Sequence, residues 1–357
     1  MPADLSVIIC SLNGAAGVDR CLHALASQKD VELQIIVVDD GSTDGTSDVA
    51  AEHGVTVFRH ETNRGLSGAR NTGIRAATAP VVAFLDDDCE PDPEWARELL
   101  DAYADSVIGV GGPAVPNAPE GFMLGFLRRN NPLLPLEMNL ARSEKLVYRL
   151  YLYALRQWAP KQPHGMREVY TLVGANMSFR RDAIAEVGAD ERFRFGSDDL
   201  DICLRVRRRF PQGRLVVTPD ACVRHHFDPS LRDTLRRSRA YGRGCAMLYL
   251  KWPTMRPTIF PAPLLVLALL VASVFLWPLL AVAVLLPQLL YPMGLRRAVT
   301  SRQLSCLLDP YVQLAQETYG NIGYLQGLWR YRGFVPETVA TVTAAHVPEE
   351  SAVGSPR

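Results

Sequence analysis

Two acidic clusters constrain the fold of this chain more than any other feature, because each directly follows an apolar, β-branched-rich run. The first is Val38-Asp39-Asp40-Gly41-Ser42, and the second is Leu85-Asp86-Asp87-Asp88. Carboxylates gathered at the ends of two buried strands repel one another and lose hydration, so they are stable mainly around a cation or a donor-rich ligand. The pattern therefore predicts a site for a metal ion and a diphosphate.

Apolar runs alternate with segments of helical spacing through the first third of the chain. Strands are predicted at 5–10, 33–38, 55–58, 80–85 and 108–112, and helices at 17–28, 47–52, 67–77 and 95–103. This rhythm implies parallel pairing in a doubly wound α/β sheet. Ligands bind such sheets at the carboxyl ends of the strands, where both acidic clusters fall.

Composition excludes several classes of function. Lys and Arg number 38, as do Asp and Glu, so the net charge is zero and no nucleic-acid partner is expected. The seven cysteines are scattered singly, which is typical of a reducing compartment rather than of a disulfide framework or a zinc site. No secretory signal is visible at the N-terminus, so we expect the first half to stay in the cytoplasm.

A basic amphipathic helix is predicted over 137–158. Its apolar side would carry Leu146, Val147, Leu150, Tyr151, Ala154, Leu155 and Trp158, with Arg142, Lys145, Arg149 and Arg156 elsewhere on its surface. The favoured interpretation is a helix packed on the core of its own domain. The alternative is contact with a membrane surface or a lipid substrate.

Residues 257–295 form a stretch of 39 residues without a single charge. One spanning helix needs only about 20 residues, and prolines punctuate the stretch. We therefore expect two shorter apolar segments that meet near Trp277-Pro278 as a hairpin, spanning or re-entrant. Arginines lie on both sides, which favours the same cytoplasmic face for both ends. A buried pair of helices in a soluble protein is the alternative.

The second acidic cluster offers hard oxygen ligands for Mg²⁺ or Mn²⁺. If the chain stays extended, Asp86 and Asp88 point the same way and can converge, with one reaching the ion and another the ribose or sugar hydroxyls. Asp40 can accept a hydrogen bond from a pyrimidine N–H. A turn-capping aspartate is the alternative for this position, and it fits Asp44 better than Asp40.

Four segments together carry a resemblance to a known family: Ser6–Asn13, Val37–Asp44, Asn63–Gly73 and Phe84–Asp92. They resemble family 2 glycosyltransferases of the GT-A fold, in the membrane-associated bacterial type, over about residues 4–227. The resemblance implies a Rossmann-like, mostly parallel sheet flanked by helices. It also implies a nucleotide-sugar donor, a divalent cation (Mg²⁺ or Mn²⁺) and inversion at the anomeric carbon.

The resemblance assigns roles on the donor side. Asp40 falls where the family binds the nucleobase, and the triplet where it binds metal and ribose. The nucleotide-sugar-binding candidates are Asn13, Asp40, Arg64, Arg70, Asp86 and Asp87, and the metal candidates are Asp88, Asp86 and His225. His226 is the reserve for His225, for which a plain surface histidine is the alternative. Leu12 stands where many members of the family have an aromatic residue, so the sequence does not identify the nucleobase of the donor.

On the acceptor side, Gly174–Arg180 resembles the family's acceptor strand, and Phe195–Arg205 resembles its Glu-Asp-x-Asp-Leu-x-x-Arg motif. Asp198 then occupies the usual Glu position and Asp199 that of the catalytic base. Either could attack the acceptor proton, and Asp199 is favoured. A helix N-terminus rich in acidic residues is the alternative, but it explains one of these aspartates rather than three.

These expectations divide the chain into six segments. They are a nucleotide-sugar-binding half (1–115), an inserted helical, acceptor-side segment (116–169), an acceptor-binding and catalytic half (170–227), a basic juxtamembrane segment (228–256), the apolar hairpin (257–295), and interfacial helices with a disordered tail (296–357).

The expected function is that of an inverting, metal-dependent glycosyltransferase on the cytoplasmic face of the cell membrane. It would add a single sugar to a lipid-linked or other glycan acceptor in cell-envelope polysaccharide or glycolipid synthesis. The alternatives are a non-catalytic nucleotide-sugar- or glycan-binding membrane protein and a nucleotidyl or phosphosugar transferase.

Overall fold

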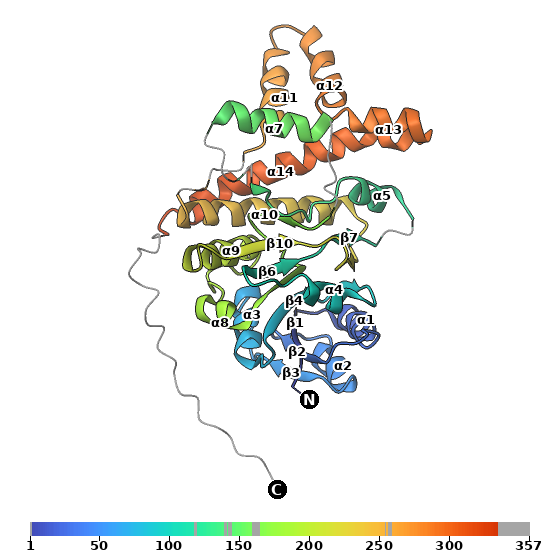
Figure 1. Cartoon of the computed structure of the whole chain (residues 1–357). Coiled ribbons are helices and arrows are strands. Elements are labelled where there is room, and N and C mark those ends of the chain that lie inside the picture. The colour runs from blue at the N-terminus through green and yellow to red at the C-terminus, as the bar shows by residue number, and fades with distance from the viewer. Residues whose placement is uncertain are drawn as a thin grey trace.

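A mixed sheet lies at the centre of the molecule (Figure 1). The computed structural model describes residues 2–117, 120–138, 141, 145–158, 165–253, 255 and 259–334. Within these residues eight strands pair in the order β3-β2-β1-β4-β9-β6-β10-β8. Their bounds are β1 Leu5–Ser11, β2 Leu33–Asp39, β3 Thr56–Arg59, β4 Val81–Asp86, β6 Val107–Gly111, β8 Arg167–Glu168, β9 Asn176–Arg180 and β10 Arg214–Val217. The predicted α/β class is confirmed.

Strand register brings the acidic clusters to one edge. β1 is parallel to both β2 and β4, with Ser11 opposite Asp39 and Cys10 opposite Asp86. β9 runs antiparallel between β4 and β6, and Asn176 lies opposite Leu85. β9 therefore begins at the edge where the parallel strands end, so the segment before it meets the acidic clusters.

Helices cover both faces of the sheet. Their bounds are α1 Ala15–Leu25, α2 Thr46–Glu52, α3 Leu66–Ala76, α4 Trp95–Asp101, α8 Arg181–Val187 and α9 Asp198–Arg209. Alternate residues of β1 face opposite sides, as a pleated strand requires. Val7 and Ile9 pack in the core that includes α1 and α4, whereas Ile8 packs in the core of α3, α8 and α9. The helices predicted in the first 103 residues are all present, with shifted ends.

A second, three-stranded sheet joins segments far apart in the sequence. Its strands are β5 Cys89–Pro91, β7 Ala114–Pro116 and β11 Val223–His225, with β11 in the middle. His225 lies directly opposite Cys89 in the antiparallel register of β11 and β5. This pairing carries His225 to the acidic triplet. A short helix, α5 Phe122–Arg129, follows β7.

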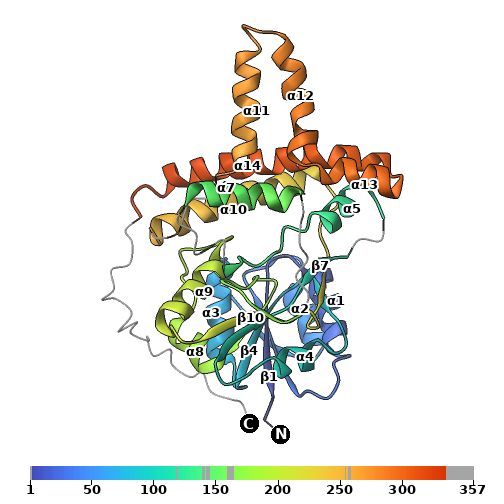
Figure 2. The same ribbon diagram turned by 45° about the horizontal axis from the view of Figure 1, so that its top comes forward.

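Long helices form a platform on one side of this domain (Figure 2). α10 Leu231–Lys251 packs along α14 Asp309–Arg330, with α7 Leu146–Trp158, α13 Met293–Ser301 and the 3₁₀ helix η1 Leu304–Leu308 completing the platform. Close packing depends on glycine, because a side chain at Gly242 would collide with the carbonyl of Gly320, and one at Gly323 with that of Arg239. The predicted basic segment 228–256 is thus largely a platform helix, while Arg256 lies outside the described residues.

An apolar hairpin projects from the platform (Figure 1). It consists of α11 Pro261–Ala272 and α12 Pro278–Leu290, so the predicted break at Trp277-Pro278 is confirmed. In the described part of the chain no single helix has the length and apolar character to cross a membrane. Pro278–Leu290 and Met293–Ser301 reach that threshold only as a bent pair, at 69°.

The structure corrects the favoured interpretation of the amphipathic helix. The described part of it, α7, does not bury the predicted apolar side: Val147 is 80% exposed and Trp158 59% exposed. α7 instead contacts α14 through polar groups. Tyr153 donates to Glu317 at 2.7 Å, and Gln313 donates to Gln157 at 2.8 Å. The predicted disordered end of the tail lies outside the described residues, as does Arg142.

Candidate active site

The prediction that Asp86 and Asp88 converge requires an extended chain, and the acidic triplet Asp86-Asp87-Asp88 is not extended. The chain turns at residues 87–88, so the three carboxylates face three different neighbours. Asp86 lies 3.9 Å from the Arg70 guanidinium, and Asp87 accepts a hydrogen bond from the Ser11 hydroxyl. Asp88 faces His225, with 3.3 Å between Oδ1 and Nε2. Asp88 and His225 are therefore brought together, while Asp86 belongs to a second cluster.

The surroundings of Asp88 fit a divalent cation. Among the described residues, Asp88 Oδ1 and His225 Nδ1 are buried polar atoms without a hydrogen-bond partner. One ligand atom each from Asp88, Cys89 and His225 lies within 4.8 Å of the others. Burial raises the pKa of Cys89 well above its usual value, which keeps it a thiol. A carboxylate oxygen and an imidazole nitrogen remain, a donor pair that suits Mn²⁺.

Charge repulsion in the triplet is only partly compensated. Burial, together with Asp86 and Asp87, raises the pKa of Asp88 to about 8. Burial also raises the pKa of Asp86, to about 6, although Arg70 opposes it. Burial and the nearby Arg237 lower the pKa of His225 to about 3, so its ring is neutral and can donate a lone pair. An added cation would relieve the crowding of negative charge.

A pocket of about 310 Å³ opens beside the triplet, at the N-terminal end of α1. It is lined by Asn13, Gly14, Ala15, Ala16, Gly17, Arg20, Asp44, Asp87 and Asp88. Gly17 permits this close approach, because a Cβ there would lie 2.8 Å from the carbonyl oxygen of Asp87. Asn13 shapes the rim: its backbone has φ of 56°, and its Oδ1 accepts from the Thr43 amide at 2.8 Å. The helix N-terminus favours negative charge in this pocket.

Asp40 lies buried at the end of β2, where it organises the following loop. Its Oδ1 accepts from His60 Nδ1 at 2.7 Å and from the Arg64 amide at 2.8 Å, and its Oδ2 accepts from the Gly65 amide at 2.7 Å. Among the described residues Oδ2 accepts this one hydrogen bond, and a carboxylate oxygen can accept a second. The Arg64 side chain lies on the surface, 3.3 Å from Glu191. Contacts of Asp40 and Arg64 with a nucleotide remain predictions.

Arg70 connects the two halves of the site. Its guanidinium is 3% exposed, forms an ion pair with Asp198, lies 3.9 Å from Asp86 and donates to the Gly174 carbonyl at 3.1 Å. Residues from β4, from α9 and from the segment before β9 thus meet around one buried cation. The contact of Arg70 with a phosphate remains a prediction. In the structure the Arg70 guanidinium lies between the carboxylates of Asp86 and Asp198.

Asp198 and Asp199 have different surroundings at the start of α9. Asp198 forms an ion pair with the Arg70 guanidinium. Within the described residues, Asp199 accepts from two backbone amides, those of Gly174 at 2.9 Å and Leu200 at 2.8 Å. Burial and the neighbouring Asp198 raise the pKa of Asp199 to about 6. A base whose pKa lies near the working pH is the more effective one, which favours Asp199.

Buried contacts with α10 fix the position of α9. Two successive residues before α9, Gly196 and Ser197, have φ of 83° and 63°, and a side chain at Gly244 would collide with the carbonyl of Gly196. Lys251 is 1% exposed, and its ammonium donates to Asp190 at 2.6 Å and to Asp201 at 2.9 Å. The catalytic-side helix is therefore tied to the platform by a buried ion pair network.

Two site residues of α10 were missed by sequence reasoning, which assigned this segment only a membrane-side role. Arg237 influences the electrostatics of Asp86, Asp88 and His225, while its guanidinium also pairs with Asp233 at 2.6 Å. Tyr241 lies near Asp86 and Asp199 and stacks on Phe195, with ring centroids 6.1 Å apart. Their i, i+4 spacing places them on one helix face. Arg232 and Arg236, and Arg239 and Arg243, have the same spacing, so the sequence alone did not single out Arg237 and Tyr241.

The chain is similar to known proteins over most of its length. The model described as Glycosyl transferase family 2 matches residues 6–188, and the one described as Glycosyl transferase family group 2 matches residues 144–306. The chain is 32% identical over 253 residues to the pre-mycofactocin glycosyltransferase of Mycobacterium tuberculosis, covering 70% of this chain and 48% of that protein.

A second relative is the glucosyl-dolichyl phosphate glucuronosyltransferase of Haloferax volcanii, 25% identical over 236 residues, covering 62% of this chain and 68% of that protein. The chain spans about half the length, or less, of several curated relatives that it matches. Among solved structures, the mannosyltransferase PcManGT from Pyrobaculum calidifontis, in complex with GDP-Man and Mn²⁺, has a TM-score of 0.53 at 15% identity, covering 92% of this chain and 88% of that one.

Proposed function

Because the chain belongs to glycosyl transferase family 2 and has an α/β GT-A fold, we propose that it transfers one sugar from a nucleotide-diphosphate donor to a hydroxyl of a lipid-linked or other glycan acceptor, with inversion. One observation carries the proposal. Arg70 bridges Asp86 of the donor half and Asp198 of the acceptor half, so that the triplet and the base Asp199 surround one site.

The side chains divide the chemistry between them. Asp199 takes the proton of the acceptor hydroxyl as this oxygen attacks the anomeric carbon. Arg70 holds Asp198 in place through their ion pair, and Arg237 supplies positive charge near the triplet as the diphosphate leaves. A divalent cation held by Asp88 and His225 would supply further neutralisation of the leaving group. Attack on the face opposite the leaving diphosphate gives the inverted product.

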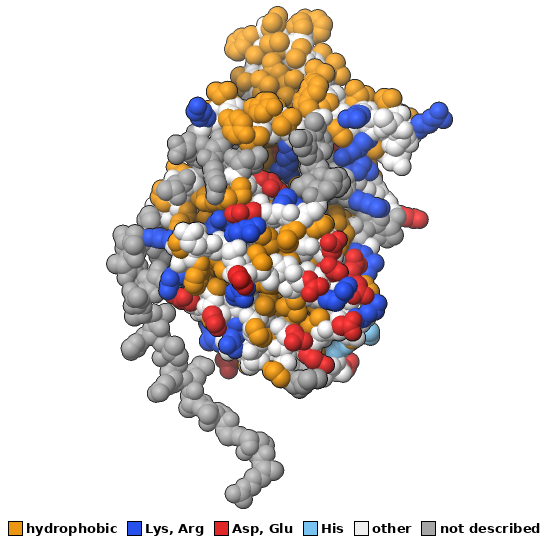
Figure 3. Space-filling model, in the orientation of Figure 1, with side chains coloured by type: hydrophobic (Ala, Val, Ile, Leu, Met, Phe, Trp, Pro, Cys, Tyr) orange, Lys and Arg blue, Asp and Glu red, His pale blue; other side chains and the backbone are white. Residues whose placement is uncertain are grey.

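A membrane-bound acceptor is supported by the apolar surfaces of the platform side. Figure 3 shows apolar side chains covering the hairpin, with Lys and Arg side chains below it. Phe275 and Trp277, between α11 and α12, are 90% and 80% exposed. At 1.5 Å per residue, α11 is about 18 Å long, short of the roughly 30 Å hydrocarbon core. We therefore propose shallow insertion of the hairpin, with α7 at the surface.

The relatives support parts of this proposal. The name of the Haloferax volcanii protein specifies a glucosyl-dolichyl phosphate acceptor, and that of PcManGT a complex with GDP-Man and Mn²⁺. By this analogy the acceptor here is lipid-linked and the cation is Mn²⁺ or Mg²⁺. The proposed location is the cytoplasmic face of the cell membrane, in cell-envelope polysaccharide or glycolipid synthesis.

A panel of nucleotide sugars tests the donor and the cation together. In the presence of Mn²⁺, we expect one of them to raise the unfolding temperature, since a ligand at 100 times its Kd stabilises the folded state by about 2.7 kcal/mol. Asp88→Asn should abolish this stabilisation. Asp92→Asn is the matched control, because Asp92 pairs with Arg224 at the surface of the same segment.

The stabilising nucleotide sugar should also release its nucleoside diphosphate when it is incubated with the protein and a lipid-linked acceptor. Stabilisation without release would identify a nucleotide-sugar-binding protein instead. Release of pyrophosphate or of a sugar phosphate would identify a nucleotidyl or phosphosugar transferase. Failure of every donor to stabilise the protein, with and without Mn²⁺, would contradict the proposal.

Vesicle flotation tests the hairpin. The wild-type chain should float with vesicles of phosphatidylcholine and phosphatidylglycerol. The double variant Phe275→Asp, Trp277→Asp should lose binding by about tenfold or more, because a carboxylate in the hydrocarbon region costs roughly 2.5–3.5 kcal/mol. Phe58→Asp, at the exposed strand β3, is the control. Equal flotation of the double variant and the control would show that the hairpin does not insert.

A further inference from the structure

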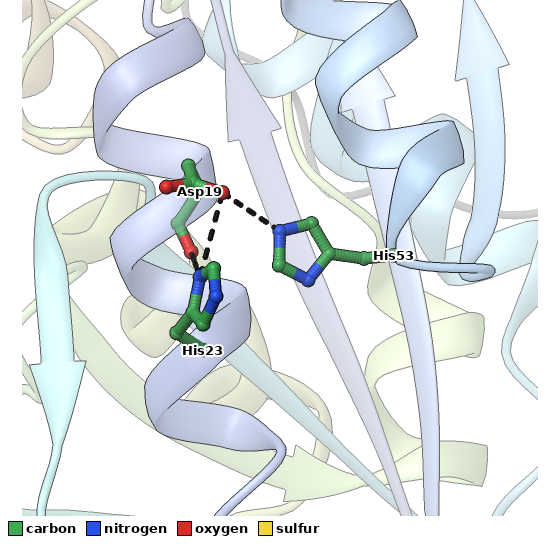
Figure 4. Close-up of side chains that lie close together, drawn as sticks. All are labelled: Asp19, His23 and His53. Atoms are coloured by element: carbon green, nitrogen blue, oxygen red, sulfur yellow. Dashed lines mark hydrogen bonds and ion pairs between the residues drawn. The ribbon is translucent and has the colours of Figure 1, made fainter.

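Two histidines and an aspartate converge on the outer surface of the donor half (Figure 4). Asp19 and His23 lie one turn apart on α1, and His53 directly follows α2. Asp19 Oδ1 lies 2.8 Å from His53 Nε2 and 3.4 Å from His23 Nδ1. One ligand atom from each residue lies within 4.8 Å of the other two. The two imidazole rings approach edge to face, with centroids 4.7 Å apart.

These distances suit a transition metal. Zn²⁺ binds imidazole nitrogen and carboxylate oxygen at about 2.0–2.2 Å, which places neighbouring ligands of a tetrahedral site about 3.3 Å apart. The two separations from Asp19 bracket this value. Two nitrogen donors and one oxygen favour Zn²⁺ over the hard cations Mg²⁺ and Ca²⁺. We propose that Asp19, His23 and His53 form a Zn²⁺ site, with a fourth position open to water, that is separate from the catalytic cleft.

The site is accessible without opening the fold. The side chain of His23 is 70% exposed, that of Asp19 48% and that of His53 19%. His23 Nδ1 lies 2.9 Å from the main-chain carbonyl of Asp19, so metal binding replaces this local hydrogen bond. In the described part of the chain, the other side-chain polar contacts of the cluster run between Asp19, His23 and His53, so no buried partner is lost when the ion binds.

A bound ion would clamp α1 to α2 behind the donor pocket. The two helices already meet at their N-terminal ends, where the Ala15 amide donates to Asp44 at 3.1 Å and the Gly14 amide to Thr46 at 3.2 Å. The metal would join them again further along. Arg20, next to Asp19, lines the pocket. A bound Zn²⁺ would therefore restrict the motion of α1 relative to α2, the two helices beside the proposed donor-binding site. This inference does not depend on the proposed reaction.

Zinc binding by the full-length chain tests this inference. In an Asp88→Asn background, which removes the proposed catalytic cation ligand, isothermal titration should show one equivalent of Zn²⁺. His23→Ala and His53→Ala should each weaken binding at least about tenfold, since even supporting partners of metal ligands contribute 10- to 100-fold. Glu52→Gln, an exposed acidic neighbour of His53, should bind like the parent.

Co²⁺ provides a second readout that is independent of activity. The parent and Glu52→Gln should give the visible absorption of tetrahedral Co²⁺, and His23→Ala should lose it. Because His23 is exposed, its variant retains the fold even if His53→Ala does not. Equal Zn²⁺ affinity in His23→Ala and Glu52→Gln, or no Zn²⁺ binding by the parent, would overturn the proposal.

Discussion

Asp199→Asn should lower kcat by about 10²- to 10⁴-fold, which is the usual contribution of a positioned general base. Asparagine keeps the shape of the side chain and can still accept from the Gly174 amide, which lies 2.9 Å from Asp199. The fold and the affinity for the donor should therefore be almost unchanged. The measurement is a comparison of single-turnover rates at saturating donor and acceptor. Asp182→Asn, with a 95% exposed side chain, is the control.

The pH profile separates a base from a merely structural carboxylate. A base acts only when deprotonated, and burial with Asp198 nearby raises the pKa of Asp199 to about 6. Wild-type kcat should therefore fall tenfold per pH unit below about 6 and level off above it. The residual activity of Asp199→Asn should lack this limb. If wild type and Asp199→Asn have the same kcat, or if the variant keeps the fall in kcat below pH 6, another group takes the proton. Asp198 would then be the next candidate.

Lys251→Met should destabilise the protein by about 3–5 kcal/mol, because removing one partner leaves the buried carboxylate of Asp201 without its ammonium partner. Lys251 is the shared cation of Asp190 and Asp201, whose side chains are 6% and 1% exposed. Burial acts to raise the pKa of Asp190, but hydrogen bonds from Arg192 and Lys251 outweigh it, so the pKa is lowered. Without the lysine, Asp190 keeps its ion pair with Arg192, but Asp201 loses its ammonium partner and must rehydrate or take up a proton.

Urea unfolding followed by circular dichroism measures this loss. Lys29→Met is the matched control, since Lys29 forms an ion pair of similar length, 3.0 Å with Glu94, but is 60% exposed. Exposed pairs contribute about 0–1 kcal/mol. Equal unfolding midpoints for the two variants would mean that the network around Lys251 does not hold α9 against the platform.

Much of the donor half could be predicted because its signals are local. The β-branched run of β1 and the glycine and aspartate residues that end β2 define strands and turns within a few residues. Parallel pairing then places Asp40 and Asp86 at one edge without further information. The positions of the three carboxylates of Asp86-Asp87-Asp88 were harder to predict. The turn at 87–88 sends Asp88 toward His225 and Asp86 toward Arg70, and neither partner is near in the sequence.

The platform shows where local patterns fail. The apolar side of α7 was assigned to a core because amphipathic helices commonly bury that side. In the structure α7 makes polar contacts with α14 through Tyr153 and Gln157, and its apolar side stays exposed. Likewise, the arginines of α10 resemble one basic belt in the sequence. The packing of α10 against α9 and α14 selects Arg237 for the site.

The sequence by itself determined the α/β class, the acidic strand ends and the uncharged hairpin, since these depend on periodicity and on spacing within short segments. Its motifs also carried the resemblance to the family. Only the tertiary structure decided which charges meet. It paired Asp198 with Arg70, left Asp199 to backbone amides, and joined Lys251 to Asp190 and Asp201. The reason is physical: the energy of a buried charge depends on partners from distant segments, and only the folded chain brings these partners within a few ångströms.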